Sequence, residues 1–402
     1  MSTVQETDVD VCFDPGVRSA YLGLGIDEYF SHFQNVLLTW IARGARLLKL
    51  DGIGNPAGIS ETLEEDFDSA VALIAEIRKI SSDIFINLST GTWPSPFWLL
   101  HSDTVWRRGH DHFFEGAVGP ARERWINYRD AMVYQNVVKE SPLFPLNSLM
   151  IHGIIFAQDA WDLSVAEGAS KDRAGINRVD GGGGSRDPFK HEVRSAFGSG
   201  AMLQELYVTP ALLESENWDD LAEAALWASS CVETMADVQW FGGDPAKGAI
   251  YGWVAWSNER AILTLRNPAP TLQIVQLEPV NVFNLPKHVV AHLQLNAPFP
   301  DQRPRQIFLN KWQQTTLEMP PFAVYVFDSG AAPPSVLAVY SDILWNIWSA
   351  GAGPAVFWTS LLVSATWLFS RSRHEASPVN AVPIQELRRR RLQALERGSF
   401  NT

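Results

Sequence analysis

Cysteine and positive charge are scarce in this sequence. Its 402 residues include 2 cysteines, Cys12 and Cys231, which is too few for a disulfide framework or a zinc-finger set. The 32 basic residues against 45 acidic ones give a net charge of -13, and this sign argues against a general nucleic-acid binder because phosphates attract the opposite charge. Met1–Asp10 is polar and acidic, so the sequence predicts no cleavable signal peptide.

Apolar and aromatic residues are abundant instead. Hydrophobic residues make up 46% and charged residues 19%, which excludes wholesale disorder and allows an ordinary buried core. The 16 Trp and 21 Phe are a composition often found where the flat apolar faces of sugars are bound. The length predicts one large domain with a smaller one, or a few small domains.

Short apolar runs alternate with longer amphipathic stretches between about residues 11 and 240. This rhythm is typical of βα units and predicts an α/β fold for this part of the chain. The expected strands are Arg46–Leu50, Ile84–Leu88, Ser148–Ile151 and Leu203–Val208. The expected helices are Ile26–Arg43, Glu61–Ile80, Arg122–Lys139 and Asn217–Ala236.

The pattern changes after Gly242–Pro245, where side chains begin to alternate with a period of two. Such runs, separated by turns, predict a small antiparallel β-sandwich over residues 246–330. The expected strands are Tyr251–Trp256, Ala261–Leu265, Leu272–Leu277, Val289–Leu293, Gln306–Leu309 and Phe322–Phe327. We therefore place a domain boundary near residue 245, with residues 1–245 as the larger domain and residues 331–342 as a linker.

Charge is unevenly distributed toward the C-terminus. Residues 343–370 contain no charged side chain, and at about 1.5 Å per helical residue this stretch is long enough to cross a bilayer core. Residues 371–402 carry seven Arg and three Glu, as expected of a basic tail that stays on the cytoplasmic side. These features predict a transmembrane helix that anchors an extracytoplasmic domain. The alternative is a hydrophobic helix docked on the preceding domain of a cytoplasmic protein.

Two aspartates are the first candidates for catalysis, because we expect each of them to end an apolar strand. Asp51 closes Leu47–Leu50, and Asp103 follows Leu99–Leu100. A retaining glycosidase uses two carboxylates about 5 Å apart, and two βα units of separation would let this pair meet across a barrel mouth. Lys49 shares a strand face with Asp51, where its cation would bind a sugar hydroxyl. The alternative is that each aspartate caps a turn or a helix.

Other side chains near these strands are candidate substrate contacts. Trp93 and Trp98 lie in a proline-rich turn, where each would either stack on a pyranose ring or fill the core. His152 ends one expected strand and Glu205 lies on another, so both are candidates to line the barrel mouth, with a buried core histidine as the alternative. The run His110–His112 resembles a metal site, but such close neighbours rarely bind one ion, and we expect no metal.

Four segments together resemble the α-galactosidase superfamily, glycoside hydrolase families 36 and 27, in a bacterial branch. They are Leu48–Gly52, Thr90–Trp98, Ser102–Arg107 and Trp125–Asp130. The resemblance implies a (β/α)8 barrel followed by a β-sandwich, a retaining double displacement and no cofactor. It also implies that Asp51 is the nucleophile, that Asp103 is the acid/base, that Lys49 contacts a sugar hydroxyl and that Arg107 clamps the substrate. The expected function is a retaining hydrolase of the α-galactosidase or α-N-acetylgalactosaminidase type, with a carbohydrate as its partner.

The sequence departs from this family in two places. Ser89–Trp93 replaces the glycine-rich cysteine motif that shapes the sugar pocket in family 36. Only about forty residues precede the Lys-x-Asp strand, which is normally the fourth of eight, so we expect a partial barrel that lacks two or three strands. The chain is then part of a longer enzyme or a degenerate relative. The alternative function is a non-catalytic, membrane-tethered carbohydrate-binding module.

Overall fold

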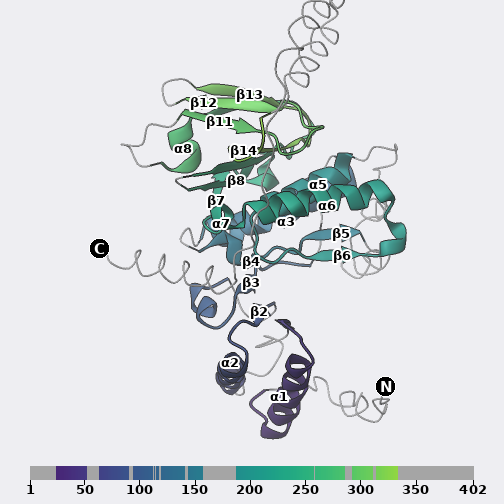
Figure 1. Ribbon diagram of the computed structural model, residues 1–402, viewed down its shortest axis with the longest axis vertical. Coiled ribbons are helices and arrows are strands. Elements are labelled where there is room, and N and C mark those ends of the chain that lie inside the picture. Colours follow the sequence, from purple (N-terminus) through teal and green to yellow (C-terminus); the bar gives the residue numbers. More distant parts are fainter. Residues whose placement is uncertain are drawn as a thin grey trace, which may run out of the picture. The chain divides into compact units, whose positions relative to one another are not determined.

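The computed structural model describes residues 24–51, 63–89, 94–111, 113, 115–116, 119–140, 144–156, 187–257, 259–285, 292–310 and 314–333 (Figure 1). Trp93, His112 and residues 334–402, with the predicted transmembrane helix, lie outside these ranges. No helix within them is long and apolar enough to span a membrane. The chain folds as two units, the first made of residues up to His110 with 135–144 and 148–151, and the second of the remaining residues.

The first unit is built on a parallel sheet. Its strands β1 (Leu47–Leu50), β2 (Phe85–Leu88), β3 (Thr104–Trp106) and β4 (Leu149–Met150) are hydrogen-bonded in this order. Helix α1 (Asp27–Ala42) precedes β1, and α2 (Leu63–Ile80) connects β1 to β2. The predicted βα order is confirmed here, and β3 is a strand that the sequence pattern does not predict.

Helices cover one face of this sheet. Leu48 and Leu50 pack in a hydrophobic cluster with apolar residues that recur every three or four positions along α2. Leu47 and Lys49 are exposed, because successive residues of a strand point to opposite faces. The sheet therefore has a helix-covered face and a second face that carries Lys49, which we call the inner face.

The second unit combines helices with antiparallel sheets. Its helices are α3 (Ala121–Val133), α5 (Asp187–Gly198), α6 (Ser215–Ser230), α7 (Val232–Met235) and α8 (Pro279–Phe283), and β5 (Ile154–Phe156) pairs in parallel with β6 (Leu206–Val208). A six-stranded sheet has the order β12-β11-β14-β9-β8-β7, and β10 pairs with β13. These strands are β7 (Gln239–Gly242), β8 (Tyr251–Trp256), β9 (Ala261–Arg266), β10 (Gln273–Leu277), β11 (His292–Asn296), β12 (Gln306–Asn310), β13 (Thr315–Met319) and β14 (Val324–Asp328). The predicted antiparallel β-structure is confirmed.

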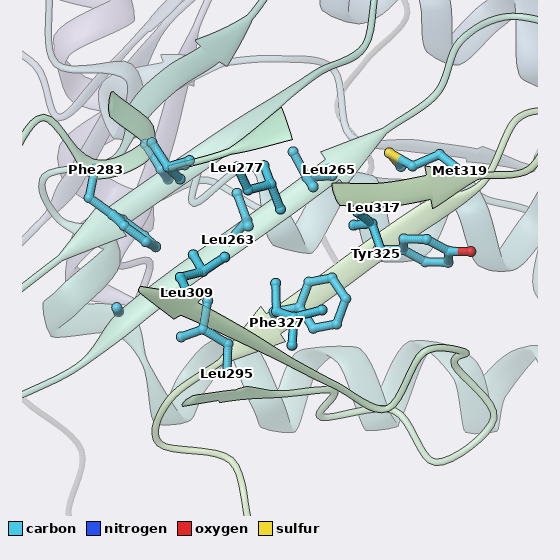
Figure 2. Close-up of a cluster of buried hydrophobic side chains, with 14 of the residues drawn as sticks. Leu263, Leu265, Leu277, Phe283, Leu295, Leu309, Leu317, Met319, Tyr325 and Phe327 are labelled. Atoms are coloured by element: carbon cyan, nitrogen blue, oxygen red, sulfur yellow. The ribbon is translucent and has the colours of Figure 1, made fainter. Parts of the chain in front are cut away.

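Both faces of the six-stranded sheet are covered at its central strand β9. Leu263 and Leu265 point into the hydrophobic cluster shared with β10 and β13 (Figure 2). Thr264 points the other way, toward α5, where a Cβ added to Gly198 would lie 2.6 Å from its Oγ1. All of β9 is consequently buried, although a strand with one solvated face would alternate between buried and exposed residues.

A partly exposed carboxylate connects α5 to the segment after β11. Asp301 accepts from Lys190 Nζ at 2.8 Å and forms an ion pair with Arg194. Burial alone would raise the pKa of the Asp301 carboxyl, but Lys190 and Arg194 outweigh this effect and lower it to about 2.

We expect Asp301→Asn to reduce the acid sensitivity of the fold. Because the folded-state pKa is depressed, the stabilisation is complete above about pH 4 and is lost as the pH falls toward about 2. Thermal unfolding measured between these pH values should show a shallower fall in Tm for the variant than for the natural protein. Parallel Tm curves would contradict the assigned pKa.

Candidate active site

The chain leaves β1 through Asp51. Strand periodicity places Asp51 on the inner face with Lys49, and both residues are exposed. The carboxyl ends of parallel strands form the edge at which α/β barrels carry their reactive groups. Asp51 is thus an accessible carboxylate at the edge where a substrate would bind.

Asp103 lies at the amino ends of the parallel strands, whereas Asp51 lies at their carboxyl ends. Strand β3 begins at Thr104, so Asp103 precedes a strand, and the expectation that it ends one is corrected. The apolar pair Leu99–Leu100 belongs to a 3-10 helix, η3 (Pro96–Leu100). Pro96 occupies its first turn, and the Ser95 side chain accepts a hydrogen bond from the Phe97 amide. The apolar run that suggested a strand is therefore helical.

The side chain of Asp103 is enclosed on the helix-covered face. It is 2% exposed, and its Oδ2 accepts hydrogen bonds from the Ile86 amide at 2.8 Å and from Arg78 Nη2 of α2 at 2.9 Å. A carboxylate held in this way contributes to the packing of α2 on the sheet and is closed to a substrate.

Asp51 and Asp103 do not converge. The parallel register makes Asp103 level with Ile86 and Leu48. Leu48 is three residues before Asp51, and Asp103 is two strands away from β1. At about 3.3 Å per residue and about 4.8 Å per strand, their Cα atoms are about 14 Å apart, with side chains on opposite faces. A retaining pair requires about 5 Å between carboxyl groups. The predicted meeting of these two carboxylates is not found.

Arg78→Met should destabilise the first unit by about 2–3 kcal/mol, because it removes the cation that compensates a buried carboxylate. Lys79→Met is the matched control, since Lys79 is the next residue and is exposed, and we expect it to change stability by less than about 0.5 kcal/mol. Urea unfolding of both variants makes the comparison. Equal midpoints would show that the Arg78–Asp103 pair does not contribute to stability.

Arg107 braces a loop. It is 0% exposed, and its Nε, Nη1 and Nη2 donate to the carbonyl oxygens of Ile151 (3.1 Å), Arg108 (2.7 Å) and His110 (3.1 Å). The guanidinium also lies 4.3 Å from the ring centroid of Trp106. A fully buried guanidinium that donates to main-chain carbonyls does not clamp a substrate, so this expectation is corrected.

The loop that Arg107 holds by hydrogen bonds leads directly to Asp111. Arg108 and Gly109 have φ values of 73° and 94°, and a non-glycine residue in this region is strained unless its surroundings hold it. The hydrogen bonds from Arg107 supply that restraint on both sides of Gly109. Asp111 follows His110 directly and is exposed, five residues beyond the carboxyl end of β3. Sequence reasoning considered Asp111 only as part of a metal-like run, and the missing signal was the position of β3.

The inner face carries buried polar groups beside Lys49. Asn87 Nδ2 donates to Thr104 Oγ1 at 2.8 Å, which joins β2 to β3. Within the described part of the chain, Asn87 Oδ1 and Ser89 Oγ are buried without a hydrogen-bond partner. Unsatisfied polar atoms in a folded interior call for an explanation, and a polar ligand is one.

Trp98 packs into the core of the first unit. Its ring lies 5.3 Å from that of Phe67 on α2, within the cluster that also holds Leu48 and Leu50. This contact matches the core-filling alternative given for Trp98 in the sequence.

His152 and Glu205 are neighbours in the second unit. The His152 amide donates to Glu205 Oε2 at 3.2 Å, and the His152 ring stacks on Tyr207 at 4.3 Å between centroids. Tyr207 in turn donates to Glu205 Oε1 at 2.6 Å. His152 and Glu205 precede β5 and β6, whose residues Ile154 and Leu206 are paired. The two predicted pocket residues are brought together, but at the amino ends of these parallel strands.

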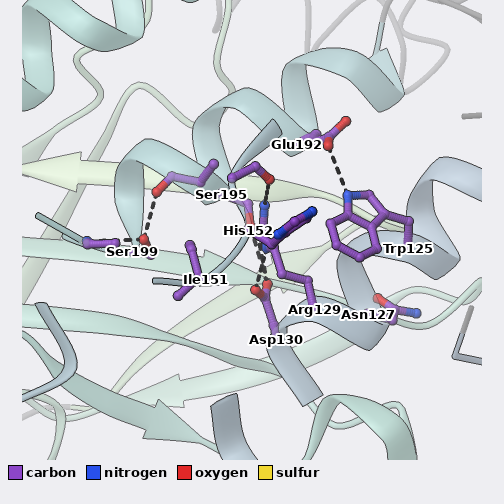
Figure 3. Close-up of polar contacts among 12 residues, drawn as sticks. Trp125, Asn127, Arg129, Asp130, Ile151, His152, Glu192, Ser195 and Ser199 are labelled. Atoms are coloured by element: carbon purple, nitrogen blue, oxygen red, sulfur yellow. Dashed lines mark hydrogen bonds and ion pairs between the residues drawn. The ribbon is translucent and has the colours of Figure 1, made fainter. Parts of the chain in front are cut away.

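Other polar residues of the second unit form a closed scaffold (Figure 3). Ser195 accepts from Arg129 Nη2 at 2.5 Å and lies 3.3 Å from Asp130 Oδ2, while Trp125 Nε1 donates to Glu192 Oε1 at 2.9 Å. All five side chains belong to residues of α3 and α5 that are 0% exposed. Their burial assigns the Trp125–Asp130 segment to packing. Within the described ranges no group of three or more His, Cys, Asp or Glu residues is placed to hold a metal ion.

Comparisons with known proteins give structural likeness and no sequence relative. No family model matches the chain, and no curated protein matches it. The structural neighbours are glycoside hydrolases. The chain is similar to α-galactosidase I from Mortierella vinacea, with 13% identity over 76% of this chain and 72% of that one, at a TM-score of 0.46.

Two further neighbours belong to the same broad class of enzyme. A family 27 β-L-arabinopyranosidase from Geobacillus stearothermophilus is 11% identical over 77% of this chain and 62% of that one, at a TM-score of 0.49. An α-amylase from Anoxybacillus is 10% identical over 78% and 65%, at a TM-score of 0.46. The α-galactosidase-like proteins that the sequence resembles are thus among the structural neighbours, at 13% and 11% identity and TM-scores of 0.46 and 0.49. The chain spans less than two thirds of these last two proteins, and no activity is taken from the likeness.

Proposed function

We propose that the chain is a retaining glycoside hydrolase of the α-galactosidase or α-N-acetylgalactosaminidase type, with Asp51 as nucleophile. The observation that carries the proposal is the exposed carboxylate of Asp51 at the carboxyl ends of the parallel strands. The Lys49 cation lies on the same face of the sheet. The substrate is a carbohydrate with a terminal α-linked sugar, and Lys49 donates to one of its hydroxyls.

Asp103 is not the acid/base of this site. It precedes β3, is 2% exposed and accepts from Arg78 Nη2 at 2.9 Å, so its carboxylate is closed to a substrate.

The reaction proceeds in two displacements. An Asp51 oxygen forms a bond to the anomeric carbon while the bond to the leaving oxygen breaks, and a general acid gives its proton to that oxygen. The ionised general acid then takes a proton from water as the water oxygen attacks the same carbon. The glycosyl–Asp51 bond breaks, and the sugar is released with its original anomeric configuration.

Hydrolysis of aryl α-galactosides and of the corresponding α-N-acetylgalactosaminides tests the proposal. Initial-rate kinetics give kcat/KM, and we expect turnover of at least one of the two substrates, with the sugar released in its original anomeric configuration.

Asp103→Asn and Asp68→Asn test the exclusion of Asp103 from the site. Asp103→Asn should lower Tm yet leave kcat/KM per folded molecule unchanged, and Asp68, exposed on α2, should affect neither. A loss of turnover confined to Asp103→Asn would return the acid/base role to Asp103. Saturable sugar binding without any hydrolysis would favour the alternative, a non-catalytic carbohydrate-binding module.

A further inference from the structure

Helix α1 of the first unit has two apolar faces (Figure 1). One face packs in the hydrophobic cluster of this unit through Leu37 and Ile41, which are buried. The other face carries Ile26, Val36 and Trp40, which are 51%, 39% and 54% exposed. A helix at the surface of a folded unit normally has one apolar face and one polar face, so the second apolar face calls for an explanation.

The exposed residues belong to a stripe that runs along the whole helix and that we call the α1 stripe. It consists of Ile26, Tyr29, Phe33, Val36 and Trp40, whose spacing alternates between three and four residues. Tyr29 and Phe33 are half-buried, and their rings stack at 6.0 Å between centroids. Apolar residues with this alternation form the seam along which two helices pack knobs into holes. The α1 stripe therefore fits a second helix with the same spacing.

The α1 stripe is complementary to itself when two copies of the helix lie antiparallel. A two-fold axis midway between Phe33 and Val36 brings Phe33 of one copy opposite Val36 of the other, so a large side chain meets a small one. The same axis brings Tyr29 opposite Trp40 and the start of the helix opposite its end. Every position of the stripe then has a counterpart on the other copy, which is the property of an isologous interface.

The charges at the two ends of α1 favour this antiparallel direction. Its first turn carries Asp27 and Glu28, and Arg43 follows its last residue. The Arg43 guanidinium lies 5.3 Å from the ring centroid of Trp40, which places the cation at the end of the stripe. In an antiparallel pair each Arg43 comes beside the acidic first turn of the other copy. A parallel pair would instead bring like charges together at both ends, and complementary charges of this kind fix the direction of an interface.

We propose that two copies of this chain associate through the α1 stripe as a symmetric antiparallel pair, with Arg43 of each copy facing Asp27 and Glu28 of the other. The inference does not depend on the proposed function, because none of these residues belongs to the candidate active site. Helix α1 has 16 residues and is about 24 Å long, so two such helices form a small interface. We accordingly expect a Kd in the micromolar range, about 1–100 μM.

Sedimentation velocity of the full chain tests the pairing. Between about 1 and 200 μM the natural protein should pass from monomer to dimer. Trp40→Glu introduces a carboxylate into the stripe of both copies and should raise Kd at least about tenfold. Asn35→Glu is the matched control, because Asn35 is exposed on α1 outside the stripe and its substitution should leave Kd unchanged.

Two outcomes of this experiment would overturn the proposal. A natural protein that stays monomeric over the whole range would show that other residues of the chain, or a different protein, cover the stripe. An equal Kd for Trp40→Glu and Asn35→Glu would show that the copies associate elsewhere. Both substituted residues are exposed, so neither variant should lower Tm, and a measured Tm identifies any loss of association that comes from unfolding.

An exchange of charges tests the contact between the ends of the helices. Arg43→Glu alone should raise Kd about fivefold, because it brings like charges together twice in the symmetric pair. Asp27→Arg and Glu28→Arg in the same chain as Arg43→Glu should restore the natural Kd, since the opposite signs then face each other again. Equal Kd values for Arg43→Glu and for the natural protein would contradict the assigned contact.

A cross-link between copies reports the direction of the helices. In a Cys12→Ser background, in which the remaining cysteine Cys231 is buried, a chain with Ile26→Cys is mixed with a chain with Arg43→Cys. Mild oxidation should join the two chains by a disulfide. Neither chain alone should be joined to its own copy, because identical positions at the helix ends are about 25 Å apart in an antiparallel pair. A disulfide between two Ile26→Cys chains would show a parallel arrangement and overturn the proposal.

Discussion

Asp51→Asn is expected to lower kcat for aryl α-galactoside hydrolysis by at least about 10³-fold, the largest effect that the proposed site allows. The substitution preserves the shape of the side chain but replaces a carboxylate oxygen that attacks carbon by a neutral amide. Because Asp51 is exposed and follows β1, the fold should be retained, and an unchanged Tm would confirm this. Steady-state kinetics at saturating substrate provide the measurement, with Asp68→Asn as the control.

A chemical rescue separates a lost nucleophile from a disturbed site. In Asp51→Gly the missing carboxylate leaves room for a small anion, and added azide should restore turnover and give a glycosyl azide of inverted configuration. The inversion follows because azide performs one displacement where the natural protein performs two. Full turnover in Asp51→Asn, or rescue with retained configuration, would remove Asp51 as the nucleophile.

The strand that leads to Asp51 could be predicted because its pattern is local. In β1 the leucines that pack on α2 alternate with Leu47 and Lys49, and this period of two places Lys49 and Asp51 on one face whatever the rest of the fold does. The antiparallel strands β8 and β9 could be recognised for a similar reason, since turns separate two runs of β-forming residues.

The position of Asp103 could not be predicted, because it depends on where a three-residue strand begins. Asp103 and Asp111 stand on either side of β3, and the apolar residues nearest to Asp103 turned out to be helical. The sequence also could not show that the Arg107 guanidinium would donate its hydrogen bonds to main-chain carbonyl oxygens. Those acceptors come from segments as far apart as Ile151 and His110, and only the folded chain brings them to one guanidinium.

The burial of charge along α3 is a further property that sequence periodicity could not reveal. Glu123 is 1% exposed and forms an ion pair with Arg266 of β9 at 2.9 Å, and its other oxygen lies 2.7 Å from His191 Nδ1. Arg266 is 0% exposed and also donates to Asn127 Oδ1 at 2.8 Å. A helix whose charged residues face other elements has no apolar stripe, so its partner on β9 is set by contacts between residues 143 positions apart, as in the Glu123–Arg266 pair.

The second large effect is expected at this buried pair. Arg266→Met should lower the free energy of unfolding by about 3–5 kcal/mol, because it leaves the Glu123 carboxylate enclosed without its buried guanidinium partner. Lys247→Met, at an exposed lysine of the same unit, should change it by less than about 0.5 kcal/mol. Replacing both partners, as Glu123→Leu with Arg266→Met, should recover part of the loss, since no buried charge then remains. Urea unfolding at neutral pH compares the variants.

The destabilisation caused by Arg266→Met is expected to depend on pH in a definite direction. Burial alone would raise the pKa of the Glu123 carboxyl, but His191 and Arg266 outweigh it and hold the pKa below its ordinary value. In the natural protein this carboxylate therefore stabilises the fold above its unfolded pKa, and the stabilisation is lost as the pH falls through the folded one. In Arg266→Met the burial effect is less opposed, the folded pKa rises, and protonation of Glu123 relieves the destabilisation. The difference in unfolding free energy between the two proteins should narrow from about pH 7 to about pH 4. A difference independent of pH would mean that Arg266 acts through its hydrogen bond to Asn127 and its packing, with no contribution from the charge of Glu123.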